Sequence, residues 1–354
     1  MSRFISQRFA DLNAYTPGEQ PQDMQYVKLN TNESPFPPSP EVVAALSQGE
    51  IEKLNLYPDP DCRILRKKIA DLYKVKSENV FLSNGSDDIL NFFFMAFCDE
   101  NRPVAFPDIT YGFYQVYADL YRLPHTVIPL RENFTLNYKD YCGIGANVVI
   151  ANPNAITGLS ISVNEIEEIL QSNPDYTVLV DEAYVDFGGE SCYRLIDKYD
   201  NLVVCRTFSK SWSMAGARLG YAIGSAGLIE DLNKIKFSTN PYSINRLTML
   251  AGAAAVDSCD YYTQNCKTVA ENRAYTITEL NSLGFETLPS KANFILTRHC
   301  SLSGDMLYQA LKSRGVLVRH WNQPRIKDYL RITIGSKVQM DILLNALKEI
   351  LKGE

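Results

Sequence analysis

A lysine at the end of an apolar run is the residue of this sequence whose surroundings best suit covalent chemistry. Residues 202–205 (Leu-Val-Val-Cys) predict a buried strand, which leads through Ser209, Lys210 and Ser211 toward Arg218. Neighbouring cations and partial burial lower the pKa of an amine, so Lys210 can be neutral and form a Schiff base with an aldehyde. Hydroxyls and a guanidinium suit a phosphate beside it. Taken alone, the pattern also fits a solvated loop lysine.

An acid follows a second apolar run upstream. Residues 178–180 (Val-Leu-Val) predict a buried strand that ends in Asp181. Open α/β sheets bind ligands beyond the carboxyl ends of their strands, so Asp181 and Lys210 are predicted to meet at one edge of a sheet. A lysine for an aldehyde and a carboxylate for a ring nitrogen are the pair that pyridoxal 5′-phosphate (PLP) requires.

Two further segments could complete such a site. Gly85, Ser86 and Asp87 stand between a predicted strand and a predicted helix, where glycine permits close approach and the helix N-terminus attracts phosphate. Tyr111 follows another predicted strand in a turn, where its ring could stack on a pyridine ring. Taken alone, the first segment fits an ordinary turn with a helix cap, and a single tyrosine usually serves packing.

Two arginines lie in apolar segments of the C-terminal part of the chain. Arg319 and Arg331 belong to predicted strands, and a guanidinium there needs an anionic partner because it cannot lose its proton. A structural salt bridge would satisfy each of them. Their presence on two neighbouring strands favours an anionic substrate instead. Tyr184, three residues after Asp181, can donate a hydrogen bond to a ring phenolate.

The elements that must position these residues alternate between strand and helix. Strands are predicted at 80–82, 103–106, 126–130, 147–151, 178–180, 202–205 and 219–223, and later at 293–296, 315–319 and 329–334. Helices are predicted at 39–48, 60–74, 87–98, 162–171, 241–258, 261–283, 304–313 and 337–351. The pattern predicts an α/β fold whose mostly parallel sheet lies between helices, followed by a smaller α+β domain. We divide the chain into an N-terminal arm packing with the small domain (1–38), a large cofactor-binding domain (39–245) and a small domain (246–354).

Composition limits the classes of partner. The 354 residues carry a net charge of −6 without a basic block, which argues against nucleic acid. No apolar run is long enough to cross a membrane, and residues 1–5 lack the apolar region of a signal peptide. The eight cysteines form no Cys-x-x-Cys pair and the three histidines have no metal spacing, so we expect free thiols, no metal and a cytoplasmic protein.

An ordered set of motifs resembles the fold-type I PLP-dependent aminotransferases of class I and II, and within them the histidinol-phosphate aminotransferase family. The resemblance runs from about Tyr15 to the final predicted helix. Its motifs are 15–20 (Tyr-Thr-Pro-Gly-Glu-Gln), 29–35 (Leu-Asn-Thr-Asn-Glu-Ser-Pro), 57–59 (Tyr-Pro-Asp), 84–87 (Asn-Gly-Ser-Asp), 181–184 (Asp-Glu-Ala-Tyr), 206–210 (Arg-Thr-Phe-Ser-Lys), 215–218 (Ala-Gly-Ala-Arg) and 330–333 (Leu-Arg-Ile-Thr). The set is more specific for fold and cofactor than for substrate.

The resemblance implies a role for each candidate residue. Lys210 is expected to bind the cofactor aldehyde and then carry a proton between substrate and cofactor, while Asp181 keeps the ring nitrogen protonated. Tyr111 is expected to stack on the ring and Tyr184 to bond its phenolic oxygen. Phosphate contacts are implied for Gly85, Ser86, Asp87, Ser209 and Arg218, and for Tyr57 reaching the other subunit of a homodimer with shared sites. Substrate contacts are implied for Tyr15, Asn32, Arg319 and Arg331.

One loop departs from the family pattern. The family carries Asn-Pro-Asn-Asn-Pro-Thr-Gly where residues 152–158 read Asn-Pro-Asn-Ala-Ile-Thr-Gly. Ala155 replaces the asparagine that bonds the phenolic oxygen. Ile156 replaces a proline, and a cis bond before a non-proline costs about 2.5–4 kcal/mol, so a trans or reshaped loop is predicted. Either Tyr184 alone, or Asn154 after a one-residue shift, is expected to hold that oxygen.

The resemblance also implies a reaction. It is transamination of L-histidinol phosphate with 2-oxoglutarate, giving imidazole acetol phosphate and L-glutamate in histidine biosynthesis. Three alternatives stay open: an aminotransferase for aromatic or other amino acids, a lyase resembling threonine-phosphate decarboxylase, and a PLP-binding regulatory module. The last would need a DNA-binding segment, and the sequence shows none.

Overall fold

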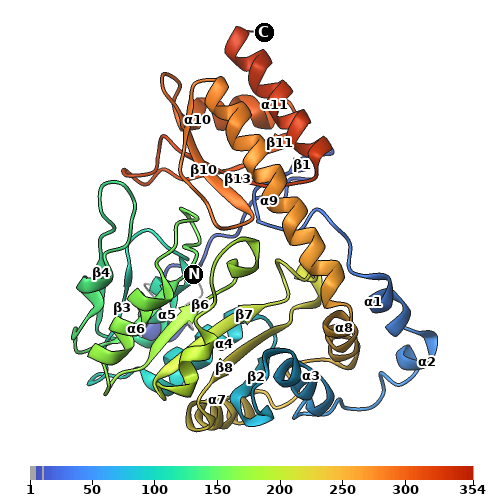
Figure 1. Cartoon of the computed structure of the whole chain (residues 1–354), viewed down its shortest axis with the longest axis vertical. Helices are drawn as coiled ribbons and strands as arrows, with labels where there is room; N and C mark the ends of the chain where they lie inside the picture. The colour runs from blue at the N-terminus through green and yellow to red at the C-terminus, as the bar shows by residue number, and fades with distance from the viewer. Residues whose placement is uncertain (1–4, 10–11, 354) are drawn as a thin grey trace.

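The computed structural model describes residues 5–9 and 12–353. A larger part, in the lower half of Figure 1, holds a layered α/β structure, and a smaller part with the C-terminus lies above it. The long helix α9 (Cys259–Ser282) runs from the larger part to the smaller one (Figure 1).

Seven strands of the described chain form the sheet of the larger part, in the order β2-β8-β7-β6-β5-β3-β4. All neighbours pair in parallel except β8, which runs against both β2 and β7. This is the mostly parallel sheet that the alternating pattern predicted. The strands are β2 (Val80–Ser83), β3 (Val104–Pro107), β4 (His125–Ile128), β5 (Asn147–Ala151), β6 (Val178–Asp181), β7 (Leu202–Thr207) and β8 (Gly220–Gly224).

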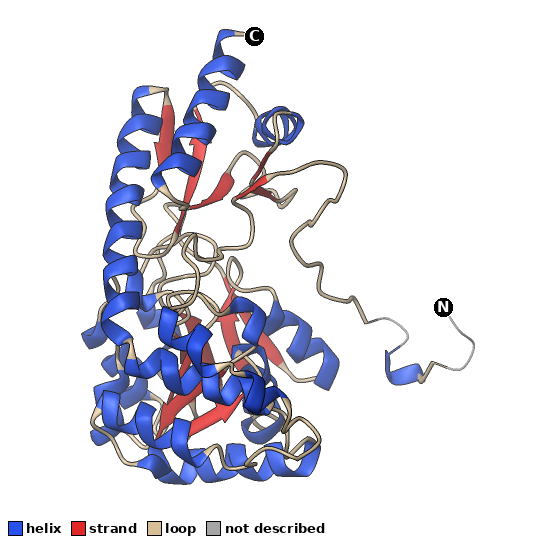
Figure 2. Cartoon of the chain, turned by 90° about the vertical axis from the view of Figure 1, so that its right-hand side faces the viewer, coloured by secondary structure: helices blue, strands red, loops and turns tan. Residues whose placement is uncertain are grey.

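Both faces of this sheet are buried. Successive side chains of a strand point to opposite faces, so Leu179 of β6 joins one apolar core while Val178 and Val180 join the other. Helices lie on both sides of the strands in the lower part of Figure 2. This two-sided cover explains why the central strands are continuous apolar runs in the sequence.

Six of the helices (α1, α6, α7, α8, α10 and α11) begin where a Ser or Asn side chain accepts a hydrogen bond from a free N–H group of the first turn. Ser162 and Glu165 form a capping box at α6, and Ser336 and Gln339 form one at α11. The helices are α1 (Pro40–Ala45), α2 (Gln48–Ile51), α3 (Arg63–Tyr73), α4 (Ser86–Phe97), α5 (Phe113–Tyr121), α6 (Val163–Ser172), α7 (Ala226–Thr239), α8 (Arg246–Asp257), α9, α10 (Gly304–Ser313) and α11 (Lys337–Lys352).

The smaller part is built on an antiparallel sheet with the order β12-β13-β10-β9. The N-terminal arm joins it through a parallel pair of short strands, with Val27 opposite Val316. The remaining strands are β1 (Val27–Lys28), β9 (Phe285–Thr287), β10 (Phe294–His299), β11 (Val316–Leu317), β12 (Arg319–His320) and β13 (Leu330–Thr333).

The structure differs from the sequence prediction in three elements of the C-terminal half. The strand predicted at 315–319 is split between β11, which pairs with the arm, and β12, which pairs with β13. Strand β9 was not predicted. The helix predicted from residue 241 begins at Arg246, because Asn245 caps it by accepting a hydrogen bond from the Thr248 N–H at 2.9 Å.

The boundary predicted at residue 246 also differs from the structure. Helix α8 packs against α1 and α3, and its Ala251 and Ala255 belong to a core of the large sheet. Tyr262, in the first turn of α9, belongs to the same core. The passage from the large to the small part therefore lies within α9.

Within residues 5–9 and 12–353, no helix is long and apolar enough to cross a membrane. The same residues contain no group of three or more His, Cys, Asp or Glu side chains that could hold a metal ion. All eight cysteines lie in the described part of the chain, and each is a free thiol.

Candidate active site

The predicted lysine and acid line one cavity at the carboxyl ends of β6 and β7. Asp181 is the last residue of β6 and pairs with Cys205, and Lys210 follows the end of β7 by three residues. The cavity has a volume of about 350 Å³. It is also lined by most of the residues predicted to hold the cofactor, namely Ser86, Asp87, Tyr111, Tyr184, Ser209 and Arg218.

Asp181 is a buried acid without a cationic partner among the described residues. Its carboxylate accepts hydrogen bonds from the Tyr114 hydroxyl at 2.9 Å and from the Ala183 N–H at 3.2 Å. Burial raises the pKa of Asp181 to about 6, although both hydrogen bonds act in the opposite direction. A protonated ring nitrogen is the kind of group that would supply the missing positive charge.

Lys210 is held by the N-terminal arm. Its Nζ donates a hydrogen bond to the carbonyl oxygen of Thr31 at 3.0 Å. Burial lowers the pKa of Lys210 to about 8, and the Arg331 guanidinium acts in the same direction. The amine is therefore partly neutral near pH 8 and can act as a nucleophile.

This pKa gives a testable pH dependence for capture of the cofactor by the apoprotein. The neutral fraction of an amine rises tenfold per pH unit below its pKa, so the capture rate is expected to rise by about tenfold per unit up to pH 8 and then level off. Stopped-flow absorbance after mixing apoprotein with PLP measures it. Arg331→Met should move the plateau to higher pH, because Arg331 lowers this pKa. A rate that still rises steeply up to pH 10 would contradict the shift.

The phosphate end of the cavity lies at the N-terminus of α4. Gly85 caps that helix with φ +90°, and a Cβ at Gly85 would lie 2.7 Å from Nη2 of Arg218. In this structure Arg218 pairs with Asp87 at 3.0 Å, and its Nη1 lies 3.4 Å from Ser209 Oγ. A helix N-terminus, a hydroxyl and a guanidinium meet there, as a phosphate requires.

The loop that departs from the family pattern corrects one prediction. The Asn154 amide donates to the Ile109 carbonyl at 2.9 Å, and its Oδ1 accepts from the N–H groups of Ile156 and Thr157. Asn154 is not among the residues that line the cofactor cavity, whereas Ala155 is. The prediction of Asn154 as a cofactor contact through a shifted loop is therefore wrong, because its side chain is used to hold the loop itself. Among the described residues the cis bond is Asn152–Pro153, so the 155–156 bond is trans.

Tyr184 keeps its place on the cavity with the help of the arm. Its hydroxyl accepts a hydrogen bond from Asn32 Nδ2 at 3.1 Å, and Asn32 Oδ1 accepts from the Thr333 hydroxyl at 3.1 Å. Asn32, predicted as a substrate contact, is thus buried and also positions Tyr184. Of the two residues predicted to bond the phenolic oxygen of the cofactor, Tyr184 and Asn154, only Tyr184 lines the cavity.

A second cavity, of about 680 Å³, adjoins the first and shares Thr31, Tyr111, Tyr184, Lys210 and Arg218 with it. The predicted substrate residues Tyr15, Asn32, Arg319 and Arg331 all line it. The Tyr15 ring stacks on Phe113, with ring centroids 4.3 Å apart.

The two arginines of this second cavity donate to backbone carbonyls and pair with no acid in the described chain. Arg331 donates to the carbonyls of Ala155 at 3.0 Å and Asn30 at 3.1 Å, and its buried Nε has no partner. Arg319 donates to the carbonyls of residues 16 and 17. Two guanidinium groups without counter-charge beside the lysine form a site for an anion.

Tyr57 lies away from both cavities. Its side chain is 79% exposed, and its ring stacks on Tyr242 with centroids 4.5 Å apart. The sequence did not point to three groups that form hydrogen bonds with site residues. They are the Tyr114 hydroxyl, which donates to Asp181, the Thr31 carbonyl, which accepts from Lys210, and the Ala155 carbonyl, which accepts from Arg331. Tyr114 follows Tyr111 by three residues and lies in the first turn of α5, and its place so close to a predicted cofactor residue is the signal that could have pointed to it.

The comparisons with known proteins agree with this site. The family model of aminotransferase class I and II matches residues 24–347. The chain is 46% identical to histidinol-phosphate aminotransferase of Brachyspira hyodysenteriae, with all of both chains aligned. It is 47% identical to histidinol-phosphate aminotransferase 2 of Dechloromonas aromatica, over 99% of each chain.

Solved structures share the fold. Histidinol-phosphate aminotransferase from Sinorhizobium meliloti, in complex with pyridoxal-5′-phosphate, aligns with a TM-score of 0.84 at 22% identity, over 93% of this chain and 92% of that one. The enzyme from Clostridium acetobutylicum aligns with a TM-score of 0.84 at 24% identity, over 92% and 99%.

Fold, site and comparisons together define a PLP-dependent aminotransferase of class I and II, with fold type I architecture. Within that class, the chain belongs to the histidinol-phosphate aminotransferase family.

Proposed function

We propose that the protein transfers the amino group of L-histidinol phosphate to 2-oxoglutarate, forming imidazole acetol phosphate and L-glutamate. The observation that carries the proposal is the pair Arg319 and Arg331, which line one cavity with Lys210 and lack an acidic partner among the described residues. The phosphate of the first substrate and a carboxylate of the second could each take that cation pair in turn. The names of the full-length relatives support the same substrate.

The residues of the cavity fit PLP as cofactor. When bound, it supplies an aldehyde that takes up the amino group and a ring that withdraws electrons. The Asp181 carboxylate holds a proton at the ring nitrogen, and Tyr184 donates a hydrogen bond to the phenolic oxygen. The Nζ of Lys210 moves the proton at the reacting carbon of the substrate. The start of α4, with Ser209 and Arg218, holds the phosphate, and the Tyr111 ring orients the pyridine plane.

An assay panel tests the proposed reaction. Purified protein with PLP is given L-histidinol phosphate, L-phenylalanine or L-threonine phosphate, each with and without 2-oxoglutarate. Glutamate is expected with histidinol phosphate as the efficient donor. Efficient transamination of phenylalanine would replace the proposal with an aromatic aminotransferase, and carbon dioxide release without an oxo acid would replace it with a lyase.

Arg331→Met is expected to lower kcat/KM for histidinol phosphate by about 100-fold, because a charge-assisted pair of hydrogen bonds to the anion is lost. Arg298→Met is the matched control: it also lies on a strand of the small sheet, but is exposed and paired with Glu286 at 2.6 Å. Steady-state kinetics with both substrates measures the effect. An unchanged kcat/KM for both substrates would remove Arg331 from the binding site.

We also propose a homodimer with shared sites, in which exposed Tyr57 reaches the partner's phosphate end. Lys210→Ala and Tyr57→Phe variants should each be impaired. In a one-to-one mixture after subunit exchange, half the dimers are mixed and each holds one intact site, so about a quarter of the wild-type activity is expected. Size-exclusion chromatography with light scattering confirms the dimer. A mixture no more active than the average of its parents would place Tyr57 outside a shared site.

Free thiols at all eight cysteines support a reducing, cytoplasmic location.

A further inference from the structure

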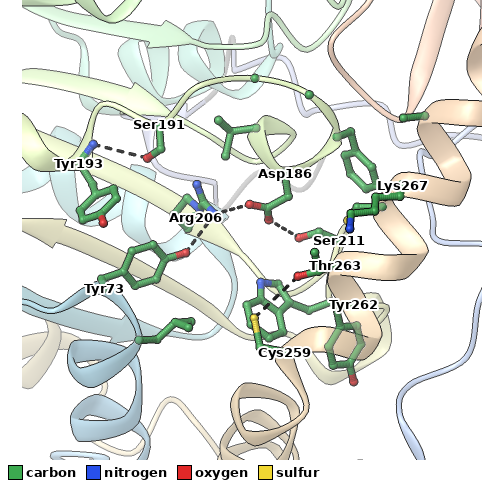
Figure 3. Close-up of a pocket in the computed structure, with 18 residues that line it drawn as sticks. Tyr73, Asp186, Ser191, Tyr193, Arg206, Ser211, Cys259, Tyr262, Thr263 and Lys267 are labelled. Carbon is green, nitrogen blue, oxygen red and sulfur yellow. Dashed lines mark hydrogen bonds and ion pairs between the residues drawn. The ribbon is translucent and has the colours of Figure 1, made fainter.

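A separate cavity lies behind the catalytic lysine, between the segment that follows β6 and helix α9 (Figure 3). Its volume is about 570 Å³, within the range of small-molecule sites. In the described chain, none of its lining residues also lines either cavity of the active site. The proposed function assigns it no role.

An ionic cluster at one side of this cavity holds more anions than cations. The buried Arg206 guanidinium lies between two carboxylates, Glu182 at 2.8 Å and Asp186 at 2.5 Å. One cation against two anions leaves this cluster a net charge of −1, and Lys267 is the other charged residue that lines the cavity in the described chain. Glu182 is fully buried, whereas the Asp186 side chain is 32% exposed and lines the cavity, so the excess charge is presented there (Figure 3).

The remaining polar groups suit the other end of a small zwitterion. Lys267 of α9 is exposed on the rim and forms no ion pair with any described residue. Trp212 is buried in the wall, and its indole N–H has no acceptor within the described structure. The Lys267 ammonium is a donor to a carboxylate, and an apolar ligand would not satisfy it.

The apolar part of the wall is mostly aromatic. Rings of Tyr73, Tyr193, Trp212 and Tyr262 line the cavity; in Figure 3, Tyr73 and Tyr193 lie on the side of Arg206 and Tyr262 lies on the side of α9. Aromatic walls favour a flat ring, which gains stacking beyond the burial of its area.

We propose that this cavity binds a small aromatic amino acid, with its ring among the tyrosines, its ammonium at Asp186 and its carboxylate toward Lys267. The cavity reaches the catalytic segment, because Ser211, the residue after Lys210, lines it and donates its hydroxyl to Asp186 Oδ2 at 2.5 Å. A ligand there contacts the segments that follow both Asp181 and Lys210.

The test uses α-methyl-L-tryptophan, which has no Cα proton to lose and so cannot be transaminated. Its binding to the full-length PLP-loaded enzyme is measured by titration calorimetry. Indole-3-propionate, which lacks the ammonium, and α-methyl-cyclohexylalanine, which lacks the flat ring, are each expected to bind at least about tenfold more weakly. Asp186→Asn should weaken the binding of α-methyl-L-tryptophan by about tenfold and leave the binding of indole-3-propionate unchanged.

Two variants separate this site from the active site. Thr263→Trp fills the cavity from the exposed face of α9 and is expected to abolish binding, while Arg331→Met is expected to leave it unchanged. Ala270→Phe fills the same cavity from a position seven residues further along α9. It replaces Thr263→Trp in the test if that variant does not fold. Binding that survives both filling variants but is lost in Arg331→Met would assign the probe to the active site and overturn the proposal. No binding at millimolar probe would also overturn it. Each outcome is independent of which amino donor the enzyme uses.

Discussion

Lys210→Ala is expected to lower the turnover number by about 10⁴-fold or more, because one side chain supplies both the nucleophile for the cofactor and the proton carrier for the reaction. Its position supports both roles: Lys210 lines the cavity that contains Asp181 and also the cavity that contains Arg319 and Arg331. The variant should also lose the cofactor adduct that borohydride makes permanent. Mass spectrometry of the reduced protein and kinetics with histidinol phosphate measure the two effects.

The matched control is Lys234→Ala, an exposed lysine of α7 that lines none of the described cavities. It should keep wild-type kinetics and the full mass increase after reduction. Retention of the mass increase in Lys210→Ala would move the attachment point to another lysine.

Asp181→Asn is expected to change activity and stability in opposite directions. Turnover should fall by about 10²–10³-fold, the scale of removing one preorganised electrostatic contact, because an amide cannot hold the proton on the ring nitrogen. The folded apoprotein, in contrast, should become more stable at pH 7.5 by about 2–3 kcal/mol, because the variant no longer buries an ionised carboxylate.

The pH dependence of that stability follows from the raised pKa of Asp181. Burial raises the pKa from 3.8 to about 6, so the folded apoprotein binds the proton more tightly than the unfolded chain does. The resulting stability is present in full below pH 3.8 and is lost as the pH rises through 6. The advantage of Asp181→Asn should therefore grow between pH 4 and 7. Urea unfolding of both apoproteins at several pH values measures it, and an advantage that stays constant with pH would contradict a buried, shifted carboxyl group.

Much of the fold follows from local pattern. The runs at 178–180 and 202–205 are apolar at every position, which happens when a strand is covered on both faces, and each ends in a polar residue at the edge where parallel strands meet ligands. For that reason the sequence alone predicts Asp181 and Lys210 at one edge of the sheet. The C-terminal half was harder to predict, because β9, β11 and β12 are only two or three residues long and are defined by their partners.

The details of the site depend on contacts between segments far apart in the chain. The Thr31 carbonyl binds Lys210 across 179 positions, and Asn32 binds Tyr184 across 152, because the arm returns to the cavity after pairing with β11. Asn154 resembled a cofactor ligand by its place in a motif, but Ile109 and the loop's own N–H groups occupy its amide.

The sequence by itself determined the chemical groups, the strands that carry them and the order of those strands along the chain. Tertiary structure decided which groups have partners. A guanidinium such as Arg331 can bind a substrate anion because no acid of the described chain packs beside it. The ionic cluster beside the separate cavity behind the lysine has one anion in excess because Glu182 and Asp186 share Arg206. Side-chain type is a local property, whereas desolvation and charge balance are sums over neighbours that only the folded chain brings together.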